Sequence, residues 1–524
     1  MQHYWRVWLV AACLKVLLFP SYFSTDFDVH RNWLAITHSR DASRWYADQA
    51  QQNQWTLDYP PLFAMYEAGL ARIAAKVDGK IVEESERDYA SVACIRFQRA
   101  TVVLTELVSL GTAVRAATAG DTRSALAFAG SGALLLVDHV HFQYNGLLLG
   151  LLVYALFMLR RGDHVKAGAL FALLCCAKHL FLTLAPVLAA VFVAAHVRPR
   201  QDFVKAFLEL AGASIAALAV GLAPLLVPAW RAGRLGAAFT ELAGRLFPFD
   251  ARGLVHSYWA PNVWALYVFA DRVLLKVLRR SAGAGATRGL VETAVEVLPA
   301  PGPKACALLT VLAGLPAVYA AARTSSAAAA RRLTYPCAAH AALAAFCFGW
   351  HVHEKFLLVA LMPLALLALE GRPRDVVVFR QAARLATFAV LPLIPGGADG
   401  VTKLLVVGAE ELILRTTFAA DAFPGDGLHC GAMAALVALK EVWPLALGGR
   451  LEFLPLMLTS VYGAVAVVAL TAYSARRLLA AGRARNAGDW EASVVAPSPR
   501  RPRAKQPRSL LKTICSLLGS RDED

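Results

Sequence analysis

The chain alternates between long apolar runs and short clusters of charged and aromatic residues. The apolar runs lack the period-2 or period-3.6 stripes of segments that keep one face in water. A crossing takes about 20 apolar residues, fewer where a helix is short or broken, so we expect about fourteen crossings. Since backbone polar groups in lipid must be satisfied within helices, the pattern predicts an all-α polytopic membrane protein. The expected segments are 4–20, 97–118, 124–138, 144–160, 166–178, 180–196, 206–229, 304–322, 333–349, 356–370, 384–397, 402–417, 430–448 and 452–475.

Basic residues gather in particular loops, which the positive-inside rule assigns to the cytosolic side. These loops are 160–166, 198–205, 323 with 331–332, 372–384 and the tail from 476. The rule then places the remaining connections on the lumenal side, namely 21–96, 138–143, 230–303 and 350–355. The apolar segment 263–278 carries Asp271, Arg272 and Lys276, so we expect an amphipathic helix on the membrane surface. The predicted organisation is one transmembrane domain, 1–475, and a basic, disordered cytosolic tail, 476–524.

Composition supports the membrane class. The 524 residues are 58% hydrophobic and 17% charged, whereas a soluble protein carries about 25% charge. The net charge of +16 could suggest nucleic acid, but its distribution over short loops and the tail favours topology signals and attraction to anionic lipid. Nine scattered cysteines without a CxxC pair predict neither a disulfide framework nor a zinc site.

A first polar cluster, 24–37, directly follows the first apolar run. In a helix that starts near residue 25, one face carries Asp26, His30, Trp33 and Thr37. A carboxylate beside a His and a Trp at a membrane entrance could deprotonate a sugar hydroxyl. Helix capping is the alternative, with Thr25 as the N-cap and Asp28 as a capping-box acid. For Asp28 the two readings are balanced, whereas for Asp26 catalysis is favoured because capping does not require these neighbours.

Two further clusters also fall in connections assigned to the lumenal side. Trp55 and Tyr59 could form an aromatic platform for a sugar ring, or an interfacial belt in which Asp58 is structural. The string 138–145 contains Asp138, two histidines and Gln143. A His pair at i, i+2 is poorly spaced for a metal on a helix, so a hydrogen-bonding network that includes His141 and Gln143 is favoured.

The fourth cluster, 350–355, contains His353, Glu354 and Lys355. Cationic and His donors near a membrane surface are costly unless they meet an anion, such as a lipid phosphate. An internal ion pair between Glu354 and Lys355 is the alternative. The same question arises for Lys178, at a break between two short helices, and for Arg245.

These strings together resemble the dolichyl-phosphate-glucose-dependent α-1,3-glucosyltransferases of lipid-linked oligosaccharide assembly. The resemblance runs from about residue 5 to 475, and the strings 24–38 and 258–267 are similar to the branch that adds the second glucose. The strings that carry it are 23–39 with 55–67, 137–146, 245–249 with 258–267, and 348–355.

The resemblance implies a GT-C membrane fold with lumenal loop helices, in the endoplasmic reticulum membrane. It implies that Asp26, the first acid of the family's Asp-Phe-Glu/Asp string, is the general base. The expected reaction moves glucose, with inversion, from dolichyl phosphate β-glucose to Glc1Man9GlcNAc2-PP-dolichol. No cofactor or metal is expected. The alternatives are the related enzyme that adds the first glucose to Man9GlcNAc2-PP-dolichol and, from another class, a polyprenyl-lipid transporter or flippase.

Overall fold

The computed structural model describes residues 2–47, 55–85, 88–249, 252–256, 258–279, 295–396, 398–418, 426–447, 451 and 453–483. All regular secondary structure in this part of the chain is helical. The α-helices are α1 (Gln2–Leu17), α2 (Thr25–Ser39), α3 (Pro61–Val77), α4 (Val92–Glu106), α5 (Thr112–Thr118), α6 (Thr122–Ala129), α7 (Gly132–Leu134), α8 (Asn145–Arg161), α9 (His164–Ala177), α10 (Ala185–Phe192), α11 (Phe203–Arg231), α12 (Leu235–Leu246), α13 (Val263–Val277), α14 (Pro303–Ala322), α15 (Ala327–Arg332), α16 (Thr334–Phe348), α17 (Leu357–Leu369), α18 (Pro373–Val390), α19 (Ala398–Thr417), α20 (Asp426–Leu447) and α21 (Leu454–Arg483).

Short 3-10 and π-helical segments continue or join several of these helices. They are η1 (Ala42–Arg44), η2 (Gly79–Val82), η3 (Leu107–Gly111), η4 (Leu135–Phe142), η5 (His179–Leu184), η6 (Val193–Val197), η8 (Glu354–Phe356) and η9 (Leu391–Leu393). The segments η3, η4 and η6 are π-helical, a geometry often found at functional sites.

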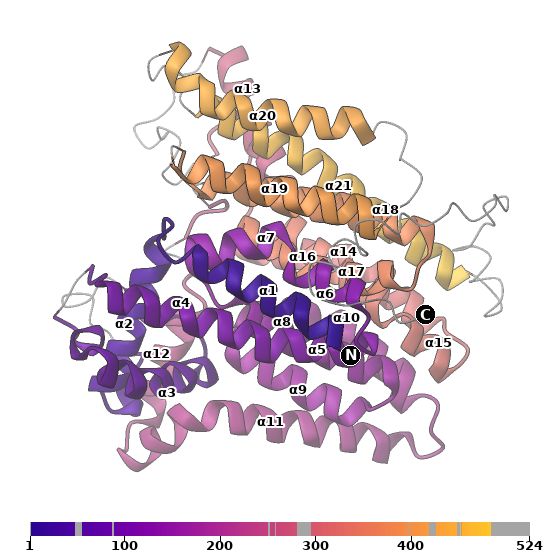
Figure 1. The fold of residues 1–524 in the computed structure, drawn as a ribbon. Helices are drawn as coiled ribbons and strands as arrows, with labels where there is room; N and C mark the ends of the chain where they lie inside the picture. The colour runs from indigo at the N-terminus through magenta and orange to yellow at the C-terminus, as the bar shows by residue number, and fades with distance from the viewer. Residues whose placement is uncertain are drawn as a thin grey trace, which may run out of the picture.

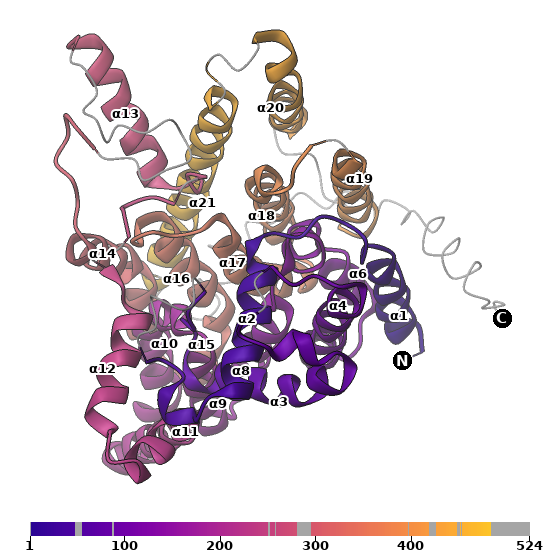
Figure 2. The ribbon, with the colours of Figure 1, turned by 90° about the vertical axis from the view of Figure 1, so that its left-hand side faces the viewer.

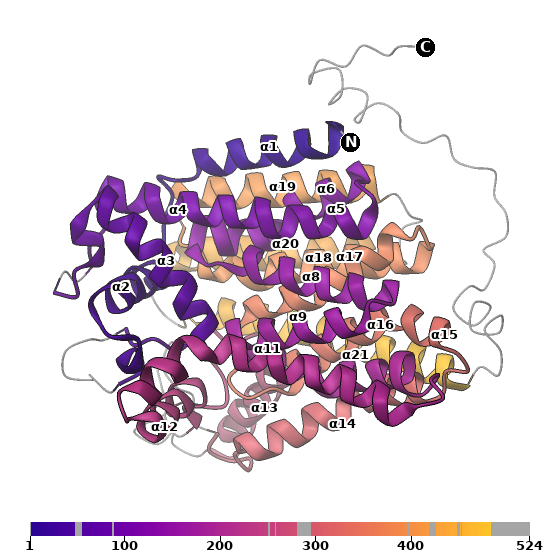
Figure 3. The same cartoon turned by 90° about the horizontal axis from the view of Figure 1, so that it is seen from below.

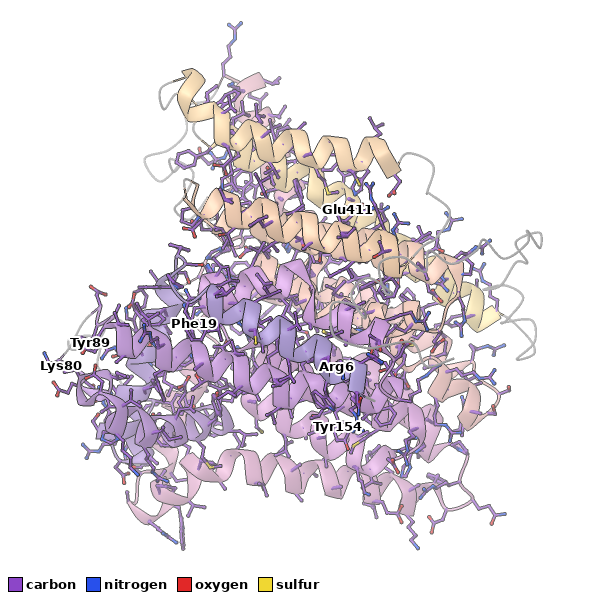
Figure 4. All side chains as sticks on the ribbon, in the orientation of Figure 1. Arg6, Phe19, Lys80, Tyr89, Tyr154 and Glu411 are labelled. Carbon is purple, nitrogen blue, oxygen red and sulfur yellow. The ribbon has the colours of Figure 1, made fainter. Side chains whose placement is uncertain are left out.

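The long helices run side by side across the molecule (Figure 1), with short elements at their two ends. One end carries α2, α3 and α12, which we call the α2 end; the other carries α15 and the N-terminus, and we call it the α15 end (Figures 1 and 3). Figure 2 looks onto the α2 end, where α2, α3 and α12 face the viewer. Lys80 and Tyr89 also lie at this end (Figure 4).

Two kinds of apolar surface distinguish the inner and outer helices. Every residue of α17 from Leu357 to Ala368 is buried. By contrast, α11 exposes large side chains such as Phe207, Ile215 and Val220. Within the described residues, six helices are long and apolar enough to cross a membrane, or seven if the bent pair Thr122–Ala129 and Gly132–Phe142 is one span. The prediction of an all-α polytopic membrane protein is therefore confirmed, since the described chain is helical and several of its helices have the length and apolar composition of membrane spans.

Each segment predicted to cross the membrane coincides with one helix or with up to three consecutive helical elements, but some bounds were wrong. The segment expected at 384–397 belongs to α18, which begins at Pro373, so Arg380 and Arg384 lie in a helix and not in a loop. Arg384 binds Glu411 (2.7 Å) and Asp426 (2.5 Å) of the neighbouring helices, which explains how a charged stretch remains helical here. The last helix, expected to end at 475, continues to Arg483, and the remainder of the predicted tail, 484–524, lies outside the described residues.

The loops separate into two groups, as the charge pattern predicted. At the α15 end, Arg160 donates to the Arg332 carbonyl (2.8 Å) and Arg198 to the Ala322 carbonyl (2.6 Å). At the α2 end, the His351 amide donates to the Leu254 carbonyl (3.0 Å). The basic loops 160–166, 198–205 and 323–332 therefore meet at one end, and the connections 230–303 and 350–355 meet at the other. The segment 263–278 forms α13, which is not among the helices that could span a membrane.

Close helix packing depends on glycine where α8 meets η3. A Cβ on Gly150 would lie 2.2 Å from the Ser109 Oγ and 2.5 Å from the Leu110 amide nitrogen. Gly212 of α11 has no atom within 4 Å of its Cβ position. A small residue such as Gly150, whose Cβ position lies against a neighbouring helix, lets two membrane helices approach closely.

We expect Gly150→Ala to lower the thermal stability of the purified protein in detergent, because η3 presents backbone atoms that cannot rotate away. The cost should be about 1–3 kcal/mol, as for other overpacked sites. Gly212→Ala is the matched control and should be neutral or slightly stabilising. Equal melting temperatures for the two variants would contradict the close approach.

Candidate active site

The start of α2 is docked onto the end of η4. Ser24 is the N-cap of α2: its hydroxyl oxygen accepts from the Asp26 amide (3.1 Å) and donates to the His141 carbonyl (2.8 Å). The Ser24 amide donates to the same carbonyl (2.9 Å). The capping alternative with Thr25 as N-cap was therefore wrong, and Asp28 is not the capping-box acid, because the cap lies one residue earlier.

The end of η4 has a strained backbone. Phe142 has φ 87°, a left-handed conformation that non-glycine residues seldom adopt. Its fully buried ring packs against Phe27 of α2 (5.2 Å between centroids), which holds the residue in place. The chain then continues through Gln143 in an extended conformation. This turn lets His141 and Gln143, two residues apart, reach the same carboxylate, consistent with strain stored at a functional site.

That carboxylate is Asp26, and three donors meet one of its oxygens. The Oδ2 atom accepts from Lys355 Nζ (2.6 Å), Gln143 Nε2 (2.7 Å) and His141 Nε2 (3.1 Å). Within the described part of the chain, the hydrogen bonds of the carboxylate all end on Oδ2, and Oδ1 accepts none. The side chain is 27% exposed. Asp26 thus presents a fixed, partly accessible oxygen.

The electrostatics of this group favour the carboxylate form. Burial alone would raise the pKa of Asp26, but the Lys355 ammonium and the His141 hydrogen bond hold this pKa well below its ordinary value. Burial lowers the pKa of His353 well below its ordinary value, and the neighbouring His256 and Lys355 lower it further. The site therefore combines an ionised Asp26 with a neutral His353 at neutral pH.

His30 and Trp33, which were expected to share a face with Asp26, lie deeper in the protein. His30 Nδ1 bonds Glu67 (2.8 Å), and the Trp33 indole donates to the Thr56 carbonyl (3.0 Å). Both side chains are almost fully buried. Burial raises the pKa of Glu67, against the effect of the His30 hydrogen bond. These residues support the loop that precedes α3.

The second cluster lies beside Asp26 and Lys178. Lys178 Nζ stands 4.7 Å from the Tyr59 ring centroid, and the Tyr59 ring packs on Trp33 (4.9 Å). Burial raises the pKa of Asp58, partly offset by Arg252, whose guanidinium lies 3.5 Å from the Asp58 carboxylate. Trp55 accepts a hydrogen bond from Asn32 through its carbonyl (2.5 Å).

The fourth cluster joins the site through Lys355. The expected alternative, an ion pair between Glu354 and Lys355, was wrong, because the ammonium turns to Asp26 and both buried oxygens of Glu354 lack a hydrogen-bond partner. The ring of His353 contacts those of His256 (4.0 Å) and His351 (5.5 Å). Three imidazoles therefore gather next to Lys355.

Two further candidate residues, Arg245 and Asp28, take no part in the hydrogen bonds to Asp26. Arg245 lies in the last turn of α12, and Phe247 just after it contacts the His179 ring (5.5 Å), next to Lys178. Asp28 lies on α2, and its charge interacts with Asp88 and Arg31, not with the Asp26 group; partial burial raises its pKa.

Sequence reasoning missed several polar residues that hold the site. Arg99 of α4 donates to the carbonyls of His139, Val140 and Tyr22, which ties η4 to the segment before α2. His139 and Lys15 (2.5 Å) both bind Glu106 inside the bundle. Arg99 and Glu106 fall inside a predicted apolar run, and a charge within such a run is the signal that could have found them. Among the described residues, no three His, Cys, Asp or Glu side chains are placed to hold a metal ion.

The fold and this cluster define a class: a polytopic helical membrane protein with a cluster of ionisable side chains at one end of its helices. Comparison with known proteins identifies the family. The model of the ALG6, ALG8 glycosyltransferase family matches residues 11–473, and the chain belongs to this family.

Curated relatives extend over most of the chain. It is 36% identical over 492 residues to the dolichyl pyrophosphate Glc1Man9GlcNAc2 alpha-1,3-glucosyltransferase of Gibberella zeae, covering 88% of this chain and 95% of the relative. It is 37% identical over 490 residues to the probable enzyme of that name from Drosophila melanogaster (89% and 92%) and 34% identical over 492 residues to that of Mus musculus (87% and 91%). The expected family is thus confirmed.

Lys355 should determine the charge state of Asp26. In Lys355→Met, burial acts on Asp26 without the ammonium, so we expect its pKa to rise. The folded variant should be destabilised at neutral pH by about 1–3 kcal/mol, less than for a fully buried ion because Asp26 is partly exposed.

The sign of the pH effect distinguishes this cause from general damage. In the wild type the lowered pKa of Asp26 contributes stability above pH 3.8, lost as pH falls through the folded-state value. In Lys355→Met the deficit should shrink as pH falls and Asp26 is protonated. Melting temperatures between pH 4.5 and 8 measure it, with exposed Lys276→Met as control. A deficit independent of pH would contradict the pairing.

Proposed function

We propose that this chain transfers glucose from dolichyl phosphate β-glucose to Glc1Man9GlcNAc2-PP-dolichol, forming the second α-1,3-linked glucose of the oligosaccharide. The names of its curated relatives and the match to their family over residues 11–473 support this proposal. The proposal includes a GT-C architecture with about fourteen crossings. It also places the protein in the endoplasmic reticulum membrane, with the α2 end in the lumen.

One observation carries the mechanism: Asp26 accepts three hydrogen bonds on Oδ2 and none from the described residues on Oδ1. A general base needs one oxygen within reach of the substrate hydroxyl. Oδ1 is that oxygen, while the donors on Oδ2 fix the orientation of the carboxylate. The Ser24 cap and the docked η4 segment hold the backbone beneath it.

The reaction is a single displacement. Asp26 Oδ1 takes the proton from the 3-hydroxyl of the terminal glucose of the acceptor. That oxygen bonds to C1 of the donor glucose, while the bond from C1 to the phosphate oxygen breaks and its electrons leave with dolichyl phosphate. A β bond becomes an α bond, so the reaction inverts. Positioning two lipid-linked substrates supplies a large share of the acceleration.

The leaving phosphate needs positive charge and fixed donors. Lys355 and His353 are the first candidates, because they stand next to Asp26; Lys178 and Arg245 are further candidates at the edge of the same group. Once donor phosphate binds, it competes with Asp26 for the Lys355 ammonium. Donor binding then strengthens the base, since the ammonium is a main cause of its low pKa.

The other residues of the site divide by exposure. Trp55, Asp58 and Tyr59 lie in the loop before α3 and are partly accessible, so they are placed to contact the acceptor sugar. Glu354 is buried, and neither of its carboxylate oxygens has a hydrogen-bond partner among the described residues. His30 and Trp33 act from below by supporting this loop. Asp28 stays a candidate at the margin.

Two other functions are less well supported. The enzyme that adds the first glucose belongs to the same family, and the names of the relatives favour the reaction that adds the second glucose. A lipid transporter tends to hold its polar site near the middle of the bilayer. Here the candidate site gathers at the α2 end of the helices (Figure 1).

Asp26→Asn should reduce glucose transfer by about a thousandfold or more, within the range of lost general-base catalysis. The amide keeps the size of the side chain, so donor binding should persist. The measurement uses purified protein with both lipid substrates and follows the oligosaccharide by mass. Asp163→Asn, an exposed change at the α15 end, is the control. Near-normal turnover by Asp26→Asn would remove Asp26 as the base.

The acceptor assay tests the branch. With donor in excess, wild-type protein should extend Glc1Man9GlcNAc2-PP-dolichol at least tenfold faster than Man9GlcNAc2-PP-dolichol, because one added sugar contributes about 1.4 kcal/mol or more of differential binding. Faster use of the unglucosylated acceptor would assign the first-glucose reaction. Movement of the donor across vesicles without transfer would indicate a transporter.

A further inference from the structure

A chain of hydrogen bonds leads from Asp26 into the protein and includes Asn145, which has no role in the proposed mechanism. Gln143 donates to Asp26 through Nε2 (2.7 Å), and its Oε1 accepts from Asn145 Nδ2 (2.9 Å). The same Asn145 nitrogen donates to Asp138 Oδ1 (2.8 Å), and the Asn145 oxygen faces Lys178 Nζ at 3.5 Å. Asp138 is fully buried and also accepts from the Gly146 amide (2.6 Å).

The direction of these bonds is fixed by chemistry. The ionised Asp26 carboxylate only accepts and the Lys178 ammonium only donates, so the Gln143 nitrogen must face Asp26 and the Asn145 oxygen must face Lys178. Asn145 therefore turns its nitrogen to Asp138. The same Asn145 nitrogen also donates to Gln143, so the Gln143 side chain must present its oxygen to Asn145. Gln143 is left with its nitrogen toward Asp26. A reversal at Asn145 would turn the Gln143 oxygen toward a carboxylate, where two acceptors repel.

We propose that Asn145 is a positioning residue: it sets the direction of the Gln143 amide and thereby keeps a donor on the catalytic carboxylate. The proposal rests on the proposed function of Asp26 as the base. Asn145 does not touch the reacting atoms. Its anchor is the buried Asp138, and both amides lie at the start of α8 and the turn before it, where the strained Phe142 has placed them.

The groups around Asp26 define what a pH profile would report. His141, Gln143 and Lys355 contact it directly. Further ionisable groups from the surrounding elements interact with its charge, including Asp58, Lys178, His256, His353 and Glu354. Loss of the Gln143 donor removes one hydrogen bond to the charged form. The pKa that governs the acid limb of the reaction should then rise.

A double-mutant cycle tests the proposal with the full-length purified protein and both lipid substrates. The variants are Asn145→Ala, Gln143→Leu and the two together, each measured for kcat and for the acid limb of kcat/KM. We expect each single change to lower kcat about tenfold, as for one lost hydrogen bond to a charged group, and to move the acid limb upward. The double variant should match Gln143→Leu, because Asn145 acts through Gln143.

The controls separate positioning from damage to the fold. Tyr144→Phe removes a neighbouring hydroxyl that bonds Thr101 (2.7 Å), not the Asp26 chain, and should leave the acid limb in place. Independent, multiplying losses in the double variant would overturn the proposal, as would an unchanged acid limb in Asn145→Ala. If Asp26→Asn were active, the proposed base would fail instead, which is a different outcome of the same assay.

Discussion

The contact between Lys355 and Asp26 is the interaction on which the candidate site depends. It joins residues 329 positions apart and brings the loop before α17 to the first turn of α2. An ammonium and a carboxylate that are both largely buried stabilise each other only with good geometry and further hydrogen bonds. His141 at the end of η4 and Gln143 in the turn after it supply those bonds. Three distant parts of the chain therefore meet on one carboxylate oxygen.

The helical bundle supplies the rigidity that this meeting requires. Arg99 of α4 donates to backbone carbonyls of η4. Glu106, also of α4, binds Lys15 of α1 and His139 of η4. Such charges are costly in an apolar interior, and here each has a partner. These interactions fix the position of η4, which holds Phe142 at a positive φ. Such a conformation persists only when the surrounding structure enforces it.

The sequence predicted the helices well because lipid demands long apolar runs, and it failed where charges pair between helices. Arg384 looks like a loop residue until Glu411 and Asp426 are seen beside it. The sequence also identified the polar segments that form the site, but not which of their side chains bind one another. A 3.6-residue period placed His30 with Asp26, whereas the packing of the loop before α3 turned His30 to Glu67. Contacts of this kind depend on tertiary packing, which the residue pattern of a single segment does not predict.

The buried ionisable side chains of this protein differ in how completely hydrogen bonds pair their polar atoms. Lys15, Glu106 and His139 satisfy one another within the bundle. Of the buried carboxylates in the described part of the chain, Glu354 alone leaves both oxygens without a hydrogen-bond partner. Burial raises its pKa, against the effect of Lys355 next to it. Where the fold leaves a buried carboxylate unpaired, protonation, water or a ligand completes it. Burial favours the protonated form of Glu354, which directly precedes Lys355, beside the site proposed for the phosphate.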